Sequence, residues 1–266
     1  MNDGAEVHPR TRFDAVADVY EARPDYPAGV FEILSTVCGV REGSDVLEIG
    51  PGSGQATIPL LDLGARVTAI EHGAGLASRL AERTTGRPIT IVNADFEDVP
   101  VSESAFDAVV SATAFHWVDP NIGFAKVARA LRPGGSLALW WNVFGDAARP
   151  DPFHDALLPI LRERAPEIAD PWSVPLAYSM DVDARVAEID VTGAFGAVEH
   201  HVIPWEGTHT ARELRDLFAT FSPWLALEQR RREALLDELE ALAREQFNDH
   251  VTRPYLTPIY IAPRRP

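Results

Sequence analysis

The chain has 266 residues and a formal net charge of −16 at pH 7, without a block of Lys and Arg. This charge disfavours a nucleic-acid partner, because a phosphate backbone would be repelled. The single cysteine excludes an intramolecular disulfide framework, and no stretch is long and apolar enough to cross a bilayer. The N-terminal MNDGAEVHPR lacks the apolar core of a signal peptide. We therefore expect a cytoplasmic protein with no membrane partner.

The first 26 residues are polar, and within them a short helix is expected at most between Phe13 and Tyr20. A core-facing helix is expected after Pro27. Strand patterns then alternate with helical ones, and the strands are expected at 45–50, 66–71, 88–95, 106–113 and 136–143. Such alternation predicts a parallel sheet with helices on both faces. The sequence Pro133-Gly134-Gly135 is expected to end the last of these helices and turn the chain into its strand.

Beyond residue 145 the alternation stops, and the pattern favours a single domain over residues 1–266. Within it we expect a cofactor-binding core at 27–143, helical cap segments at 145–190 and 207–250, and final strands at 194–206 and 254–263. A cap over the carboxyl ends of the strands would shape a ligand pocket. Its amphipathic helices would pack on the sheet or on a second subunit, so the pattern is compatible with a monomer or a homodimer.

The motif LEIGPGSGQAT follows the first strand. Gly50 permits a tight turn, and Gly52 and Gly54 would let a ligand approach the backbone without a Cβ in the way. Nicotinamide dinucleotides and S-adenosylmethionine are both held at such loops. The dinucleotide pattern G-x-G-x-x-G/A requires a small third residue, but Gln55 stands there when counted from Gly50. Pro51 removes an amide donor, which favours a ligand with less phosphate.

Acidic residues end the next two strands. Glu71, with His72 beside it, comes about 20 residues after the glycines, where a carboxylate can accept hydrogen bonds from ribose hydroxyls. Asp95 follows the third strand and can accept from an adenine amino group, with Phe96 as an apolar wall. Singly, Glu71 is also compatible with a solvated acid and Asp95 with a helix cap. Their joint placement indicates an adenosine-bearing cofactor.

At this point the sequence resembles a known family. The motifs EIGPGSG, Glu71, Asp95-Phe96, FDAVVSATAFHWV and LRPGGSLAL are similar to the successive motifs of class I S-adenosylmethionine-dependent methyltransferases, over about residues 27–143. The resemblance implies a Rossmann-like α/β fold with a seven-stranded, mostly parallel sheet whose last strand is antiparallel. It also implies S-adenosyl-L-methionine as the cofactor and a small-molecule substrate.

The segments RFDAVADVYEARPDYP and AFHWVDP are most similar to the branch of trans-aconitate and juvenile hormone acid methyltransferases, which act on small-molecule carboxylates. A carboxylate oxygen is therefore the first expectation for the acceptor. Hydroxyl, amine and carbon acceptors stay open. So do two other function classes, a nicotinamide-dependent oxidoreductase and a non-catalytic protein that retains the pocket.

His116 and Trp117 follow the fourth strand, where this fold places its acceptor pocket. His116 would act as a general base or orient a carboxylate, and Trp117 would donate its indole N–H to an acceptor oxygen; both are also compatible with packing. By resemblance, the segment with Tyr20 and Arg23 folds over the cofactor. The fourth strand ends in Ser111-Ala112-Thr113 without an acid, so no metal is expected. Ser111 is a further candidate for the cofactor site.

Five more residues are expected to cap a helix or to line the pocket rather than to take part in the chemistry. Asp119 is expected to cap the helix after His116 rather than to do chemistry. Aromatic residues and one histidine of the proposed cap would line the pocket, although each taken alone is more typical of packing: His154, Trp172, Tyr178 and Trp224.

Overall fold

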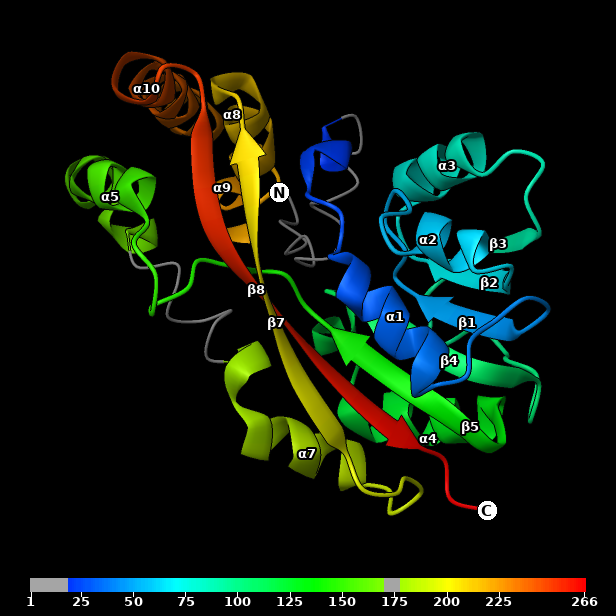
Figure 1. The fold of residues 1–266 in the computed structure, drawn as a ribbon. Coiled ribbons are helices and arrows are strands. Elements are labelled where there is room, and N and C mark those ends of the chain that lie inside the picture. The colour runs from blue at the N-terminus through cyan, green and yellow to red at the C-terminus, as the bar shows by residue number, and fades with distance from the viewer. Residues whose placement is uncertain (1–18, 170–177) are drawn as a thin grey trace, which may run out of the picture.

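One mixed β-sheet forms the centre of the fold in a computed structural model, which describes residues 19–169 and 178–266 (Figure 1). Five strands lie in the order β3-β2-β1-β4-β5, and each pairs in parallel with its neighbours. The strands are β1 (Asp45–Ile49), β2 (Arg66–Glu71), β3 (Ile89–Asn93), β4 (Phe106–Ala112) and β5 (Leu131–Trp140). The predicted parallel core is confirmed.

The C-terminal strands complete the sheet beside β5. Strand β8 (Val251–Pro263) pairs antiparallel with β5, and β7 (Glu199–His209) pairs antiparallel with β8. The last strand therefore runs against the others, as the family resemblance implies. A two-residue strand that the sequence did not predict, β6 (Val143–Phe144), adds to the free half of β8.

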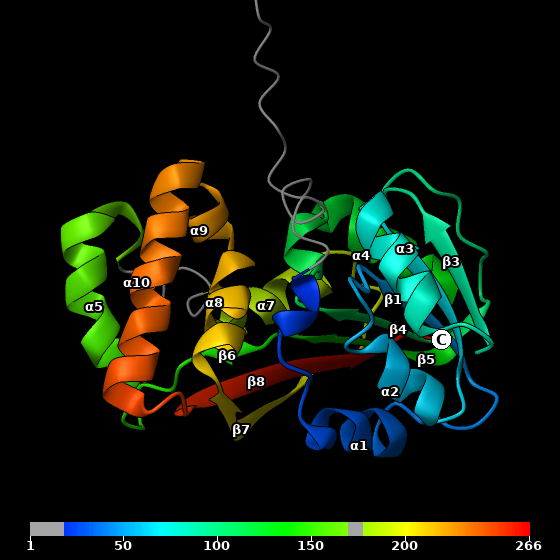
Figure 2. The same ribbon diagram turned by 90° about the horizontal axis from the view of Figure 1, so that it is seen from above.

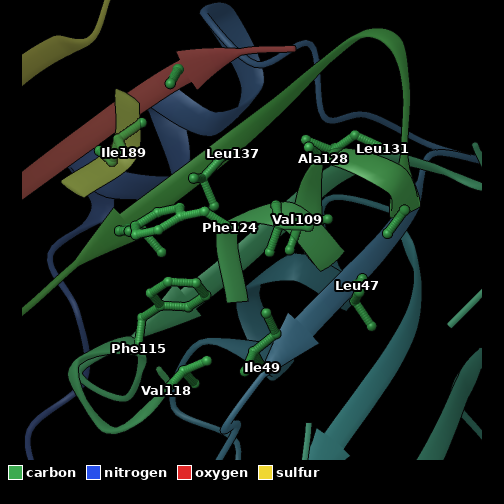
Figure 3. Close-up of a cluster of buried hydrophobic side chains, with 14 of the residues drawn as sticks. Leu47, Ile49, Val109, Phe115, Val118, Phe124, Ala128, Leu131, Leu137 and Ile189 are labelled. Atoms are coloured by element: carbon green, nitrogen blue, oxygen red, sulfur yellow. The ribbon is translucent and has the colours of Figure 1, made fainter. Parts of the chain in front are cut away.

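Helices cover both faces of the sheet. Helices α1 (Ala28–Thr36), α2 (Thr57–Asp62) and α3 (Ala74–Arg83) pack on one face, and α4 (Pro120–Ala130) and α7 (Val182–Asp190) pack on the other. Side chains alternate between the two cores along each strand, as strand geometry requires. Figure 3 shows the second core, where Phe124 and Ile189 approach Leu137 and Val109.

The remaining helices form a cap with a hydrophobic core of its own. They are α5 (Pro152–Arg164), α8 (Ala211–Ala219), α9 (Ser222–Leu225) and α10 (Gln229–Phe247). Figure 2 shows them gathered at the far end of β7 and β8, opposite α2 and α3. A buried ion pair, Arg253 to Asp151 at 2.7 Å, joins β8 to the start of α5. Helix α7 lies within the stretch 145–190 expected to be cap, but it packs beside α4 on the sheet.

The expected turn between α4 and β5 is wrong in detail. Helix α4 ends at Ala130 and β5 begins at once, with the glycines inside a bulge where the register shifts between Phe106 and Ala108. A Cβ on Gly135 would come within 2.8 Å of the Asp107 carbonyl, so glycine permits the close approach of the strands there. Asp119 caps α4 as predicted, because its carboxylate accepts from the Asn121 amide at 2.9 Å.

The described part of the chain begins at residue 19, shortly before α1. A short 3-10 turn spans Tyr20–Ala22. The helix expected between Phe13 and Tyr20 lies almost wholly outside the described residues. No helix that the structure describes combines the length and the apolar character needed to cross a bilayer.

Candidate functional site

A cavity of about 640 Å³ lies between the carboxyl ends of the parallel strands and the cap. This volume falls within the roughly 300–1,000 Å³ of small-molecule sites. Each of the five core strands contributes residues at or just beyond its end: Ile49 and Gly50, Glu71 and His72, Ala94 and Asp95, Thr113 and Ala114, Trp141 and Asn142. The cap contributes three aromatic side chains, Phe218, Phe221 and Trp224, together with Glu167, Ile168, Ser222 and Pro223.

The glycine turn after β1 is held by close contacts within the protein. Gly50, Gly52 and Gly54 all have positive φ angles, of +67°, +59° and +102°. A Cβ on Gly50 would lie 2.4 Å from the Cβ of Ala114, and one on Gly52 would lie 2.8 Å from the Tyr20 ring. The sequence predicted a tight turn at Gly50, and at Gly52 and Gly54 it predicted that the absence of a side chain lets a ligand approach the backbone. In the structure, protein atoms already occupy the space that these side chains would need.

Glu71 connects this turn to the end of β2. Its two carboxylate oxygens accept from the backbone amides of Gly52 and Gly73, at 3.0 and 2.8 Å. The side chain lines the cavity although its residue is only 6% exposed. A carboxylate only accepts hydrogen bonds, so ligand hydroxyls could donate to this side chain at the cavity wall.

The wall beyond β3 combines a polar pair with an apolar surface. His72 Nδ1 lies 3.1 Å from Asp95 Oδ2, and both side chains line the cavity. Phe96 is largely buried and also lines the cavity. The ammonium group of Lys126, a buried residue, lies 4.9 Å from the centroid of the Phe96 ring. Burial lowers the pKa of Lys126, which donates to the Phe96 carbonyl.

Sequence reasoning missed Glu48, a fully buried acid in β1 directly before the glycine turn. The Thr57 hydroxyl donates to its Oε2 at 2.6 Å, and its Oε1 is buried without a hydrogen-bond partner in the described part of the chain. Burial raises the pKa of this carboxyl to about 8, so it is mostly protonated at neutral pH. The available signal was an acid between the apolar residues Leu47 and Ile49 of β1.

His116 and Trp117 lie in a 3-10 turn, Phe115–Trp117, at the centre of the cavity wall. The Trp141 indole N–H donates to His116 Nδ1 at 3.2 Å. The imidazole is exposed at the cavity wall, and the protein atoms packed around it partly desolvate it. This desolvation, together with the positive charges of Arg23 and Arg185, lowers the pKa of His116 to about 4.

The segment before α1 closes one side of the cavity. Tyr20 and Arg23 both line it. The Arg23 guanidinium donates to the hydroxyl and the carbonyl of Thr220, at 3.2 and 2.9 Å, and so joins this segment to the end of α8.

The structure brings most of the predicted site residues to this one cavity: Tyr20, Arg23, Gly50, Gly52, Glu71, His72, Asp95, Phe96, His116 and Trp117. Pro51 lines a smaller adjoining cavity of about 20 Å³. Of the other described candidates, Gly54 and Ser111 lie outside both cavities, and the Ser111 hydroxyl donates to the Ile49 carbonyl at 2.8 Å.

Some of the predicted cap residues also line the cavity and others do not. Tyr178 and Trp224 line the cavity, His154 does not, and Trp172 lies outside the described residues. Sequence reasoning missed further lining residues, among them Trp141, Asn142, Phe144, Phe218 and Phe221. Within residues 19–169 and 178–266, no three His, Cys, Asp or Glu side chains are placed to hold a metal ion.

Known proteins share both the sequence and the fold. A family model described as a methyltransferase domain matches residues 47–139. An uncharacterized methyltransferase of Mycobacterium tuberculosis is 29% identical over 232 residues, which are 86% of this chain and 84% of that protein. Another, from Geobacillus kaustophilus, is 34% identical over 151 residues, covering 52% of this chain and 69% of that protein.

Solved structures show the same fold at lower identity. One from Anaeromyxobacter dehalogenans, provisionally named a type II methyltransferase, has a TM-score of 0.60 and 24% identity, covering 91% of this chain and 97% of that chain. Phosphoethanolamine N-methyltransferase 2 of Haemonchus contortus, in complex with S-adenosyl-L-methionine, has a TM-score of 0.57 and 15% identity, covering 95% and 57%. The chain therefore belongs to the methyltransferase family and has its class I, Rossmann-like fold.

Proposed function

We propose that the protein is an S-adenosylmethionine-dependent methyltransferase that acts on a small molecule, with a carboxylate oxygen as the first candidate for the acceptor atom. One observation supports this most strongly. A single cavity joins the strand-end acids Glu71 and Asp95 to the aromatic wall around His116. The cavity thus offers a place for an adenosine-bearing donor and a second place for its acceptor.

The residues on the strand side fit the cofactor. Glu71 is oriented by two backbone amides, and its carboxylate would accept from ribose hydroxyls. Asp95 would accept from the adenine amino group, and Ile70, Leu76 and Phe96 offer apolar surface for the ring. When bound, S-adenosylmethionine supplies an electrophilic methyl group. The chain's own contribution is to align the acceptor with it, which can lower a barrier by about 7–11 kcal/mol.

A carboxylate is the simplest acceptor because it is already ionised at neutral pH. Hydroxyl and amine acceptors would need a base to remove a proton. The relative from Haemonchus contortus is named an N-methyltransferase, but at 15% identity this likeness concerns the fold and gives no acceptor for the present chain.

Calorimetry with S-adenosylhomocysteine tests the cofactor assignment. We expect binding by the wild type and a loss of about 10- to 150-fold in Glu71→Gln, because a hydrogen bond to a charged group contributes about 1.5–3 kcal/mol. The matched control is Glu82→Gln, an exposed acid on α3. Stabilisation by NAD without binding of S-adenosylhomocysteine would instead identify an oxidoreductase.

A labelled methyl donor tests the acceptor. We expect label on carboxylic acids in a panel that also contains phenols and amines. Cofactor binding with no transfer to any member of a broad panel would favour a non-catalytic protein that retains the pocket.

A further inference from the structure

We propose that His116, held by Trp141, donates a hydrogen bond to an anionic oxygen of the acceptor and does not act as a general base, so that the acceptor is a carboxylic acid with an apolar body. This inference rests on the proposed methyltransferase function and names its substrate class. Four features of the cavity carry it: the hydrogen bond at His116 Nδ1, the packing of Trp141, the charges nearby and the aromatic cap wall.

The hydrogen bond from Trp141 selects one form of the imidazole. An indole N–H can only donate, so the His116 Nδ1 that faces it at 3.2 Å must offer a lone pair. The proton of the neutral ring is then on Nε2. A nitrogen that already carries a proton cannot take another from a substrate, but it can donate a hydrogen bond to one.

The packing of Trp141 keeps this form in place. Trp141 is buried, and its ring makes edge contacts with Tyr178 and Tyr260 at centroid distances of 5.7 and 6.1 Å. Its backbone amide donates to the Pro258 carbonyl of β8. Because the indole is held on several sides, protonation of Nδ1 would set two N–H groups against each other.

The charged groups around His116 favour an anion beside it. Arg23, from the segment before α1, and Arg185, from α7, both oppose its protonation. Arg185 is compensated by Glu188, to which it donates twice, at 2.6 and 3.1 Å. Arg23 donates to Thr220, and the positive charges of both arginines favour a carboxylate beside His116 over an ammonium group.

Other titratable groups of the cavity wall are already engaged. Tyr178 faces His116 at 5.8 Å, donates to Glu188 and has a pKa raised by burial. Glu167 is paired with Arg231. On the opposite wall, Glu71 accepts from two amides, and Asp95 pairs with His72. An acceptor that is ionised before it binds needs none of them as a base.

The cap supplies the surface for the rest of the acceptor. Phe221 contacts Phe144 and Phe218 at ring distances of 4.6 and 5.0 Å, and Phe218 contacts Trp224 at 5.3 Å. All four rings line the cavity. Because aromatic walls gain most by covering apolar surface, the body of the acid should be aromatic or aliphatic rather than polar.

The reaction then balances without a proton transfer. A lone pair of the carboxylate oxygen forms the new bond to the methyl carbon while the carbon–sulfur bond breaks and its electron pair stays on sulfur. The products are a neutral ester and a neutral thioether. His116 and Arg23 would orient the carboxylate, and Trp141 would act as a positioning residue through His116.

Nitrogen-15 NMR of the wild-type protein tests the state of His116 without a turnover assay. We expect the proton on Nε2 and titration near pH 4. In Trp141→Phe, which removes the donor, we expect a higher pKa and a mixture of both neutral forms. A proton on Nδ1 in the wild type, or titration of His116 near pH 6.5, would overturn the proposal.

A matched panel tests the substrate class: 3-phenylpropionic acid, its alcohol, its amine, and succinic acid as a polar acid. We expect labelled methyl on the phenyl acid at a rate at least tenfold above the other three. His116→Gln, which keeps a donor, should retain more than a tenth of kcat/KM, whereas His116→Phe should lose about a hundredfold. A base role predicts that both variants are equally inactive, and label on only the alcohol or amine would also refute the inference.

The two levels of hypothesis fail in different ways. If S-adenosylhomocysteine does not bind the wild type, the proposed function fails before the panel is used. If it binds and no panel member is labelled, the NMR result decides whether His116 is a donor. For Trp141→Phe, kcat/KM for the acid should gain a dependence on pH between 5 and 7 that the wild type lacks, an effect that a merely structural role would not produce.

Discussion

Glu48 should make the stability of the protein depend on pH. Its carboxyl group is fully buried beneath the glycine turn, and burial raises its pKa from 4.5 to about 8. Between these values the folded state keeps a proton that the unfolded state releases. The stabilising contribution is therefore complete below about pH 4.5 and is lost as the pH rises through about 8. We predict that Glu48→Gln removes this loss.

The magnitude follows from the two pKa values. Each pH unit between them lowers the free energy of unfolding by up to about 1.4 kcal/mol. From pH 5 to pH 8, a group with these two pKa values lowers the free energy of unfolding by about 3–4 kcal/mol in total. The glutamine side chain can still accept from the Thr57 hydroxyl, which donates to Glu48 at 2.6 Å. The free energy of unfolding of Glu48→Gln, relative to that of the wild type, should therefore rise by about 3–4 kcal/mol between pH 5 and pH 8.

Urea denaturation at pH 5, 6, 7 and 8 measures this difference. Glu82→Gln removes one exposed carboxylate and controls for the change in net charge. Parallel curves for the wild type and Glu48→Gln across this range would refute the assignment of a buried, protonated carboxyl to Glu48.

Further predictions concern the glycine turn and the cap. Gly50→Ala should lower the free energy of unfolding, measured by thermal melts, by about 3 kcal/mol, because its φ is +67° and the new Cβ would meet Ala114 at 2.4 Å. The control Gly86→Ala has a φ of +78° but open space around the new Cβ, so it should lower the free energy of unfolding by only about 1 kcal/mol. Asp151→Asn should lower the free energy of unfolding, measured by chemical denaturation, by about 3–5 kcal/mol, since the buried Arg253 guanidinium loses its carboxylate. A change below about 1 kcal/mol would show that the ion pair is not isolated from water.

The core of the fold was predictable because its strands carry strong local signals. Parallel strands covered on both faces are short apolar runs, and β1, β2 and β4 all have this pattern. The bulge at Gly135 had no comparable signal, since a Pro-Gly-Gly sequence is equally typical of a turn. The strand pairing of β6 spans two residues and depends on where β8 lies, which local sequence does not specify.

The strand side of the site was predictable from topology. The carboxyl ends of parallel strands meet at one edge of a sheet, so Glu71, Asp95 and His116 could be expected together before any coordinates. Their detailed roles were less accessible. The space beside Gly52 is taken by Tyr20, a residue more than 30 positions away in sequence, and no local pattern reveals that contact.

The cap side depends on the ribbon formed by β7 and β8. Beyond the five residues of β8 that pair with β5, the ribbon continues past the sheet and supports α8 and α10 at its far end (Figure 1). Helix α8 follows β7 directly and brings Phe218 to the cavity wall. The indole of Trp141 illustrates the consequence. Sequence analysis placed it inside the strand expected at 136–143, whereas β5 ends at Trp140 and Trp141 is the first residue beyond it. Its backbone amide donates to the Pro258 carbonyl of β8 while its indole N–H donates to His116. A change in the ribbon should thus alter acceptor selection before it alters cofactor binding.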